Sequence, residues 1–271
     1  MHFDSTEAFW ERVRVPARLD LAKLLPASLR KGKRFETLDD ARAYSAATQA
    51  VLRRTKREQY LRHAEALEDC ANGDRTCAQP FCPCCARPFR RWLTANLLEL
   101  ANDAADAKVL TIFAETFETG RLCDADILLA QRRLRQRLRR CGFVGSLVIG
   151  GTEVSYSART ETWTLHFHVV VVDAKPNTIR LLIEKSAKDW RWAVKCEDLR
   201  DRVRQLSYLQ KFSTFHRPGR ARPGQRARAF PLPKAQLLEL VDWLSSYRFE
   251  DFTFLFGARR RGKRIVRLNP A

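Results

Sequence analysis

The sequence predicts an α+β fold in which a central antiparallel sheet is flanked by helices and preceded by an N-terminal helical region. Three observations support this expectation. Residues 105–271 alternate strand-like and helix-like segments in an order that suits an antiparallel sheet. Residues 1–104 are mainly helical in pattern, and five cysteines fall within residues 70–85, between two helical stretches. We therefore expect two regions, 1–104 and 105–271.

The N-terminal region is expected to hold helices on both sides of a short cysteine-bearing knuckle. Residues 17–69 contain few helix breakers, and their apolar residues recur at helical spacing. The segment 70–85 is short and includes prolines, which favours a compact knuckle. Residues 89–105 resume the helical pattern.

The C-terminal region is expected to begin with a strand over Lys108–Phe117 and a basic amphipathic helix over 124–141. Two β-rich runs, Phe143–Ser157 and Thr162–Asp173, flank the polar stretch Ala158–Glu161 and predict an antiparallel hairpin. The remaining expected elements are helices over 181–188, 197–212 and 237–247, a flexible basic loop over 216–230, and a closing hairpin that joins FTFLFG to RIVRL.

The charge balance points to a polyanionic partner. The chain has 271 residues, with 50 Lys+Arg against 31 Asp+Glu and a formal net charge of +19. Such a surplus repels itself, and binding to phosphates relieves the repulsion while it releases counterions. No apolar run approaches the ~18 residues that a membrane span needs, and residues 1–16 lack the apolar stretch of a signal peptide. We expect a cytoplasmic protein that binds nucleic acid and no membrane.

Two histidines in a predicted strand are the sharpest local signal. His166 and His168 alternate with apolar residues, so both imidazoles project from one face of the strand. If the hairpin turns near residues 159–160, Glu153 lies opposite His166 or His168, and opposed Cβ atoms are roughly 4.5–5.5 Å apart. A carboxylate with two imidazoles leaves coordination positions open, and Mg²⁺ or Mn²⁺ would suit a phosphate substrate. A register slip of one residue would destroy this cluster, and two histidines on a solvated face are the simpler alternative.

Tyr208 and Lys211 form a second, weaker signal on the predicted helix over 197–212. At positions i and i+3 they share one helix face. A phenol has a pKa near 10, so it needs activation before it acts as a nucleophile. A neighbouring ammonium favours the phenolate and neutralises phosphate charge. If Tyr208 is not a nucleophile, Tyr156 and Tyr247 are the next candidates.

Together these residues resemble the HUH endonucleases, especially the rolling-circle replication initiators of small bacterial plasmids. GFVGSLVIGGTEVSY and WTLHFHVVVV look like the central hairpin of that family, and KVLTIFAETF looks like its first strand motif. The resemblance covers roughly residues 60–260 and implies an HUH-type sheet, which is ferredoxin- or RRM-like. It implies that His166, His168 and Glu153 hold the metal, and that Tyr208 attacks DNA to form a 5′-phosphotyrosine, with Lys211 beside the phosphate. It further implies a single-stranded or hairpin origin as partner, and a host helicase.

The cysteine segment resembles the Cys-rich segment found before the nuclease core in many of these initiators. With Cys70 as the fourth ligand, the set is Cys70, Cys77, Cys82 and Cys85, a tetrahedral structural Zn²⁺ site. Cys84 has no place in this scheme, and His63 could replace Cys70. Buried free thiols are the alternative interpretation.

Some features leave the function open. Many plasmid-type members carry a tyrosine directly after the lysine, where this chain has Phe212, so either Tyr208 works alone or the nuclease is impaired. The alternatives are a transposase, a mobilisation relaxase, or a zinc-stabilised nucleic-acid-binding protein without catalysis. Flexible arginines hold phosphates without reading bases, and the expected DNA contacts are Arg217, Arg220, Arg222, Arg226 and Arg228.

Overall fold

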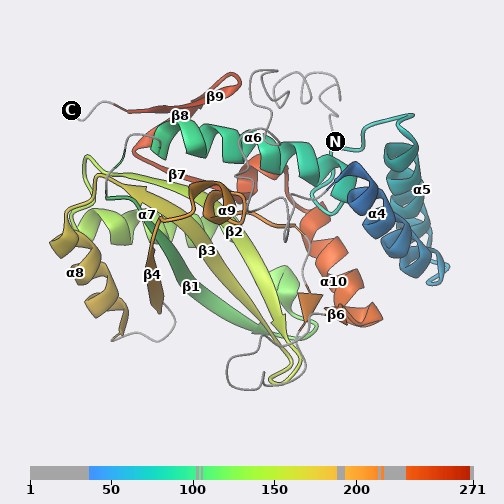
Figure 1. Cartoon of the computed structure of the whole chain (residues 1–271). Helices are drawn as coiled ribbons and strands as arrows, with labels where there is room; N and C mark the ends of the chain where they lie inside the picture. The colour runs from blue at the N-terminus through green and yellow to red at the C-terminus, as the bar shows by residue number, and fades with distance from the viewer. Residues whose placement is uncertain are drawn as a thin grey trace.

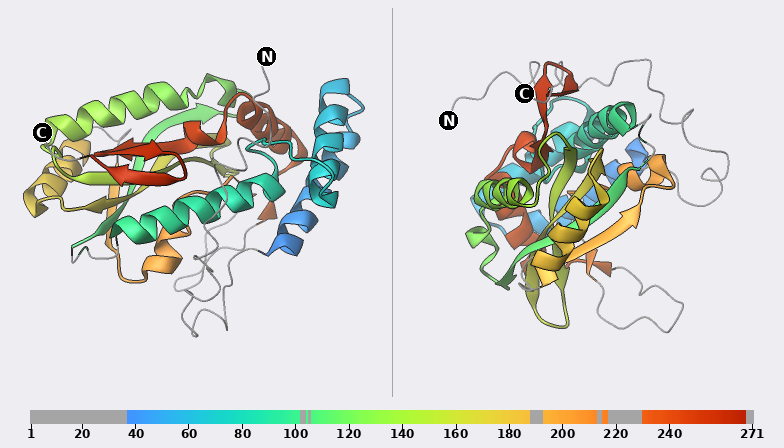
Figure 2. Two further views of the ribbon diagram at one scale, coloured as in Figure 1. Left: turned by 90° about the horizontal axis from the view of Figure 1, so that it is seen from above. Right: turned by 90° about the vertical axis from the view of Figure 1, so that its left-hand side faces the viewer.

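The computed structural model describes residues 37–101, 104, 106–187, 193–212, 215–216 and 230–268. A five-stranded antiparallel sheet lies between helices on its two faces (Figures 1 and 2). The expected α+β class with an antiparallel sheet is therefore confirmed. The sheet order is β4-β1-β3-β2-β7. Its strands are β1 (Lys108–Glu118), β2 (Leu147–Ser157), β3 (Thr162–Val172), β4 (Val194–Asp198) and β7 (Thr253–Phe256).

The helices cover the sheet unequally. Helix α6 (Pro83–Ala101) and the short α9 (Arg202–Leu206) lie on one face, and α7 (Ile127–Arg140) lies on the other (Figure 2). At one end of the sheet are α4 (Leu38–Arg53), α5 (Glu58–Asn72) and α10 (Lys234–Ser245), where Tyr60 of α5 donates a hydrogen bond to Asp242 of α10. The other described elements are α8 (Pro176–Ala187), the 3₁₀ turns Leu122–Asp124 and Phe249–Phe252, and the short strands β5 (Phe215–His216), β6 (Phe230–Pro231), β8 (Ala258–Arg261) and β9 (Arg264–Arg267).

One hydrophobic core joins the N-terminal helices to the sheet. Leu52 of α4, Phe89 and Trp92 of α6, and the strand residues Leu165 and Phe167 are fully or almost fully buried in the same cluster. The indole nitrogen of Trp92 donates to the backbone oxygen of Lys263 between β8 and β9. Helix α6 therefore anchors the C-terminal hairpin as well as the cysteine segment.

The expected N-terminal helices differ from the structure in their boundaries. The described part of the 17–69 stretch forms two helices rather than one. The helical conformation is interrupted between Arg53 and Glu58, where Lys56 adopts a positive φ of 58°. Helix α6 begins six residues before the expected residue 89. Its first position is Pro83, where the missing N–H costs nothing. The segment 70–85 thus overlaps the ends of α5 and α6.

Two expectations for the C-terminal half are wrong, and a third falls mostly outside the described residues. Residues 197–212 do not form one helix: β4 pairs with β1, and a short irregular segment separates it from α9, whose N-cap Asp201 accepts a hydrogen bond from the backbone N–H of Arg204. The closing hairpin does not join FTFLFG to RIVRL, because β7 pairs with β2 and β9 pairs with β8. Gly257, with a φ of 70°, makes the turn between β7 and β8. Most of the loop 216–230 lies outside the described residues.

Helix α7 owes its start to a side-chain cap, and this gives a test of the fold. Asp126 accepts a hydrogen bond from the backbone N–H of Leu129 at 2.9 Å. The variant D126A should lower the free energy of unfolding by about 1 kcal/mol, measured by urea denaturation. D126N should retain most of the stability, because asparagine caps equally well. An equal loss of unfolding free energy in D126A and D126N would show that the charge of Asp126, rather than its capping hydrogen bond, stabilises the helix.

Candidate active site

The β2–β3 hairpin brings the predicted acid and histidines together. Glu153 pairs with His166, and Gly151 pairs with His168. Directly opposed residues of an antiparallel pair share a face, so Glu153 and both imidazoles project from the same side of the sheet. The prediction that Glu153 lies opposite His166 or His168 is confirmed, and the structure selects His166.

The three side chains converge on a common point. Glu153 Oε2 lies 3.8 Å from His166 Nε2 and 3.7 Å from His168 Nε2. One ligand atom from each residue lies within 4.8 Å of the other two. Glu153 and His166 are buried, and the side chain of His168 is 17% exposed. These separations suit three ligands around one divalent cation, with coordination positions left open.

Backbone and hydroxyl groups orient both imidazoles. His166 Nδ1 lies 3.2 Å from the carbonyl oxygen of Thr164, which can only accept, so Nδ1–H donates and Nε2 keeps its lone pair. His168 Nδ1 lies 2.9 Å from Thr111 Oγ1 on β1. Metal-binding histidines typically have the second ring nitrogen held in this way.

The electrostatics also suit a cation. Burial alone would raise the pKa of Glu153, but the neighbouring His166, His168 and Lys211 together outweigh it, so that pKa is lowered. Burial lowers the pKa of His168 to about 4, so this imidazole is neutral near pH 7. Glu153 Oε1 is buried without a hydrogen-bond partner among the described residues. A bound cation would satisfy this oxygen, and an ionised carboxylate with a neutral imidazole is the state that binds one.

Tyr208 and Lys211 lie beside this group, although not on a helix. Helix α9 ends at Leu206, Tyr208 lies in the following turn, and Lys211 lies in irregular chain, which corrects the predicted helical placement. The rings of Tyr208 and His168 are 6.4 Å apart, and Lys211 Nζ is 2.7 Å from the centre of the Tyr208 ring. Tyr208 is 53% exposed, so its phenol can be reached from solvent.

Gly151 makes room for the Tyr208 segment. A Cβ at this position would lie 2.5 Å from the backbone oxygen of Leu209 and 2.9 Å from Gln210 Cβ. Only glycine therefore lets residues 209–210 pack directly on β2, two positions from Glu153. Sequence reasoning missed this role, and it also missed Thr111 and Thr164. Two glycines in the middle of a strand were the available signal, since they often mark a close backbone approach.

The cysteine cluster is the second group that could hold a metal. One sulfur each from Cys70, Cys77, Cys82 and Cys85 lies within 4.8 Å of the others. Cys85 Sγ is 3.7 Å from both Cys70 Sγ and Cys77 Sγ. A Zn–S bond of about 2.3 Å gives a tetrahedral edge of about 3.8 Å, which these distances match. They are far longer than the ~2.05 Å of a disulfide.

The surroundings of the cluster favour a thiolate at Cys70. The backbone N–H of Cys77 donates to Cys70 Sγ at 2.9 Å. Hydrogen bonds from Cys77, Cys82 and Cys85 lower the pKa of Cys70 far below its usual range, while the contacts with Cys70 and Cys77 raise those of Cys82 and Cys85. Four thiolates need a cation between them. His63 does not replace Cys70, because it packs against Phe81 instead, and Cys84 stands outside the group.

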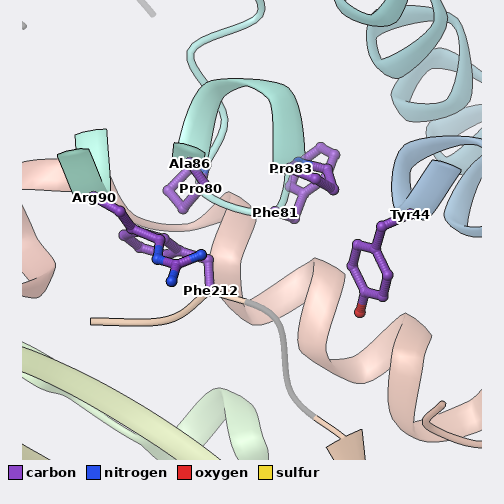
Figure 3. Close-up of a pocket in the computed structure, with 7 residues that line it drawn as sticks. All are labelled: Tyr44, Pro80, Phe81, Pro83, Ala86, Arg90 and Phe212. Carbon is purple, nitrogen blue, oxygen red and sulfur yellow. The ribbon is translucent and has the colours of Figure 1, made fainter. Parts of the chain in front are cut away.

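Phe212 connects the cysteine segment to the Tyr208 segment. Its ring is buried against Phe89, Phe249 and Phe252, with centroids 6.0, 5.0 and 5.2 Å away. A hollow of about 20 Å³, room for about one water molecule, lies between the two segments (Figure 3). Its lining residues are Tyr44, Pro80, Phe81, Pro83, Ala86, Arg90 and Phe212.

Neither the predicted arginine contacts nor the comparisons with known proteins identify a function. Arg217, Arg220, Arg222, Arg226 and Arg228 lie outside the described residues. No helix in the described ranges is long and apolar enough to cross a bilayer. Comparisons of the chain with protein-family models, curated proteins and solved structures each found no match. The function must therefore be argued from the two side-chain groups themselves.

The two groups should bind metals independently. Co²⁺ added to the protein stripped of metal should give thiolate-to-cobalt charge-transfer absorption, and C82S should abolish it. Mn²⁺ binding, measured by calorimetry, should be lost in H168A and retained in C82S. The matched controls are C123S, at an exposed cysteine outside the cluster, and H63Q. Unchanged binding in C82S and H168A would contradict both site assignments.

Proposed function

We propose that the chain is a metal-dependent DNA-nicking and strand-joining enzyme of the HUH endonuclease type, which initiates rolling-circle replication at an origin. The observation that carries the proposal is the convergence of Glu153, His166 and His168 beside the accessible phenol of Tyr208. A metal-ligand set open to substrate and a potential nucleophile within one site are what phosphodiester transfer requires.

Glu153, His166 and His168 would hold a Mg²⁺ or Mn²⁺ ion. When bound, the ion would polarise the scissile phosphate as a Lewis acid. The buried, unpaired Glu153 Oε1 and the two oriented Nε2 atoms fit such an ion. Two imidazoles favour Mn²⁺ over Mg²⁺, because Mg²⁺ prefers an all-oxygen shell.

Tyr208 would supply the nucleophile. Its phenolic oxygen attacks the scissile phosphorus, a tyrosine–phosphorus ester forms, and the bond to the 3′ oxygen breaks. The phenolic proton passes to solvent or to the leaving 3′ oxygen, which departs as a hydroxyl group. Lys211, whose ammonium lies over the Tyr208 ring, would favour the phenolate and balance the phosphate charge. Attack by a freed 3′-hydroxyl on the phosphotyrosine reverses these bonds and rejoins the strand.

The surroundings of the other candidate hydroxyls favour Tyr208 as the single nucleophile. Tyr247 donates its hydroxyl to the backbone oxygen of Ala125 at 2.9 Å. Tyr156 is buried against Trp163. Position 212 carries a phenylalanine packed among three others, so it serves as an anchor for the segment that bears Tyr208.

The cysteines would hold a structural Zn²⁺ ion. Four sulfur ligands close the coordination shell, so this ion would have no open position for chemistry. It would fix the first turn of α6, and through Phe89 and Phe212 it would support the Tyr208 segment. The net charge of +19 supports DNA as the partner.

Covalent capture tests the proposed function. The protein is incubated with Mn²⁺ and a single-stranded oligonucleotide that carries the origin hairpin, and adducts are resolved on a denaturing gel. Wild type and Y247F should form the adduct, whereas Y208F and H166A should form none. Mn²⁺ should give more product than Mg²⁺. An adduct that survives Y208F would place the nucleophile elsewhere, and DNA binding without any adduct would leave a non-catalytic binding protein.

A second variant tests the positioning of Tyr208. In G151A the new methyl group must displace residues 209–210, and a shift of about 1 Å can cost ~10²-fold in rate. We expect adduct formation to slow by at least tenfold, while Mn²⁺ still binds, because Glu153 and the histidines are untouched. S155A, an exposed position of the same strand, is the matched control. A G151A protein with the wild-type rate would refute the packing argument.

A further inference from the structure

Helix α7 carries an unusual concentration of positive charge. Its fourteen residues, ILLAQRRLRQRLRR, include six arginines and no acidic residue. At 100° per residue, the exposed positions occupy one continuous arc, and the opposite arc packs on the sheet. The exposed polar positions of this arc are Arg132, Arg133, Gln136, Arg139 and Arg140, and Leu128 lies at its edge.

Three of these arginines have no acidic partner within the described part of the chain. Arg133 lies 3.6 Å from Glu115, but Arg132, Arg139 and Arg140 form no ion pair with any described residue. We call these three the arginine stripe. By contrast, Arg42, Arg62 and Arg180, which are exposed on other helices, each lie within 4 Å of a carboxylate.

Repulsion between neighbouring arginines destabilises helix α7 when no counterion is bound. Four arginine pairs stand three or four positions apart on α7: 132/135, 137/140, 133/137 and 135/139. Like charges at this spacing each destabilise a helix by about 0.2–0.5 kcal/mol. The helix dipole offsets the cost for arginines in the last turn, but not for Arg132, which is two turns from the C-terminal end.

The stripe lies across the sheet from the candidate active site. Gln131 of α7 donates to Thr152 Oγ1 and to the backbone oxygen of Asp251, and Arg135 lies over the Phe254 ring. Thr152 projects from the sheet face opposite to Glu153, because neighbouring strand residues alternate. Figure 2 shows α7 and α6 on opposite sides of the sheet.

We propose that the arginine stripe binds the sugar-phosphate backbone of duplex DNA, without reading its sequence. The choice of DNA rests on the proposed function, in which the opposite face cuts a single strand. Single strands are usually held by stacking on aromatic side chains, and α7 has none. A membrane surface is disfavoured, because the apolar arc of α7 is buried on the sheet and Leu128 alone is exposed.

This arrangement gives the sheet two DNA-binding faces. The flank of an origin that remains double-stranded would rest on α7, while the unpaired strand reaches Tyr208 on the other side. Phosphate contacts at one rigid helix would fix the position of the protein on the DNA and leave sequence recognition to other residues.

The test compares two triple variants that remove the same charge. R132Q/R139Q/R140Q removes the arginine stripe, and R42Q/R62Q/R180Q removes three arginines that have acidic partners. Binding to a short labelled duplex of arbitrary sequence is measured by fluorescence anisotropy at several salt concentrations, after circular dichroism has shown that both variants fold. Poly-glutamate serves as a second, non-nucleic polyanion.

If the stripe contacts three phosphates, its removal should flatten the slope of log affinity against log salt by about 2.7. Between about 50 and 200 mM salt, wild type should then lose roughly 40-fold more affinity than the stripe variant. The control variant should keep a slope close to that of wild type. Equal slopes in the two variants, or a loss confined to poly-glutamate, would overturn the inference.

Failure of the proposed function is distinguishable from failure of this inference. The adduct on a single-stranded oligonucleotide is scored for the wild-type protein alone. Absence of that adduct, together with a stripe-dependent salt slope, would reject the nuclease and keep the duplex-binding surface. An adduct, together with equal salt slopes in the two triple variants, would keep the nuclease and reject the duplex-binding surface.

Discussion

The register of the β2–β3 hairpin is the constraint on which the candidate active site depends. A slip of one residue would turn Glu153 away from both histidines, because strand side chains alternate between faces. Pairing on the far side of β3 reinforces the register, since Thr111 of β1 stands opposite His168 and contacts its ring. Burying a carboxylate with an unpaired oxygen costs stability. Such a cost without a structural benefit supports a ligand-binding role.

The two candidate metal-binding groups are linked through one helix. Helix α6 begins within the cysteine cluster, and one turn after Cys85 its Phe89 packs with Phe212, the residue after Lys211. The cysteine cluster can therefore stabilise the segment that presents Tyr208 without any contact with the reacting atoms. Gly151 completes this arrangement from the sheet side by admitting residues 209–210. Both supports act on the same short segment, which no helix or long strand otherwise holds.

Local sequence patterns predicted the hairpin well and the later elements poorly. Alternation and a short loop set the pairing of Glu153 with His166, and both signals are local. The strand β4 was missed because it is a five-residue edge strand rich in charge, fixed by β1 and by the ion pair from Lys108 to Asp198. The pairing of β7 with β2 joins residues about a hundred positions apart, which no local pattern encodes. The site residues were therefore foreseeable, whereas the turn that carries Tyr208 was not.

The central claim is that this register assembles a metal centre beside a reactive phenol. Mass spectrometry of the protein after reaction with oligonucleotide and Mn²⁺, followed by nuclease and protease digestion, tests it most directly. The account predicts a nucleotide remnant attached to the peptide that contains Tyr208, with no such peptide when Mn²⁺ is chelated. A remnant on another residue, or cleaved DNA with no protein attached, would contradict it.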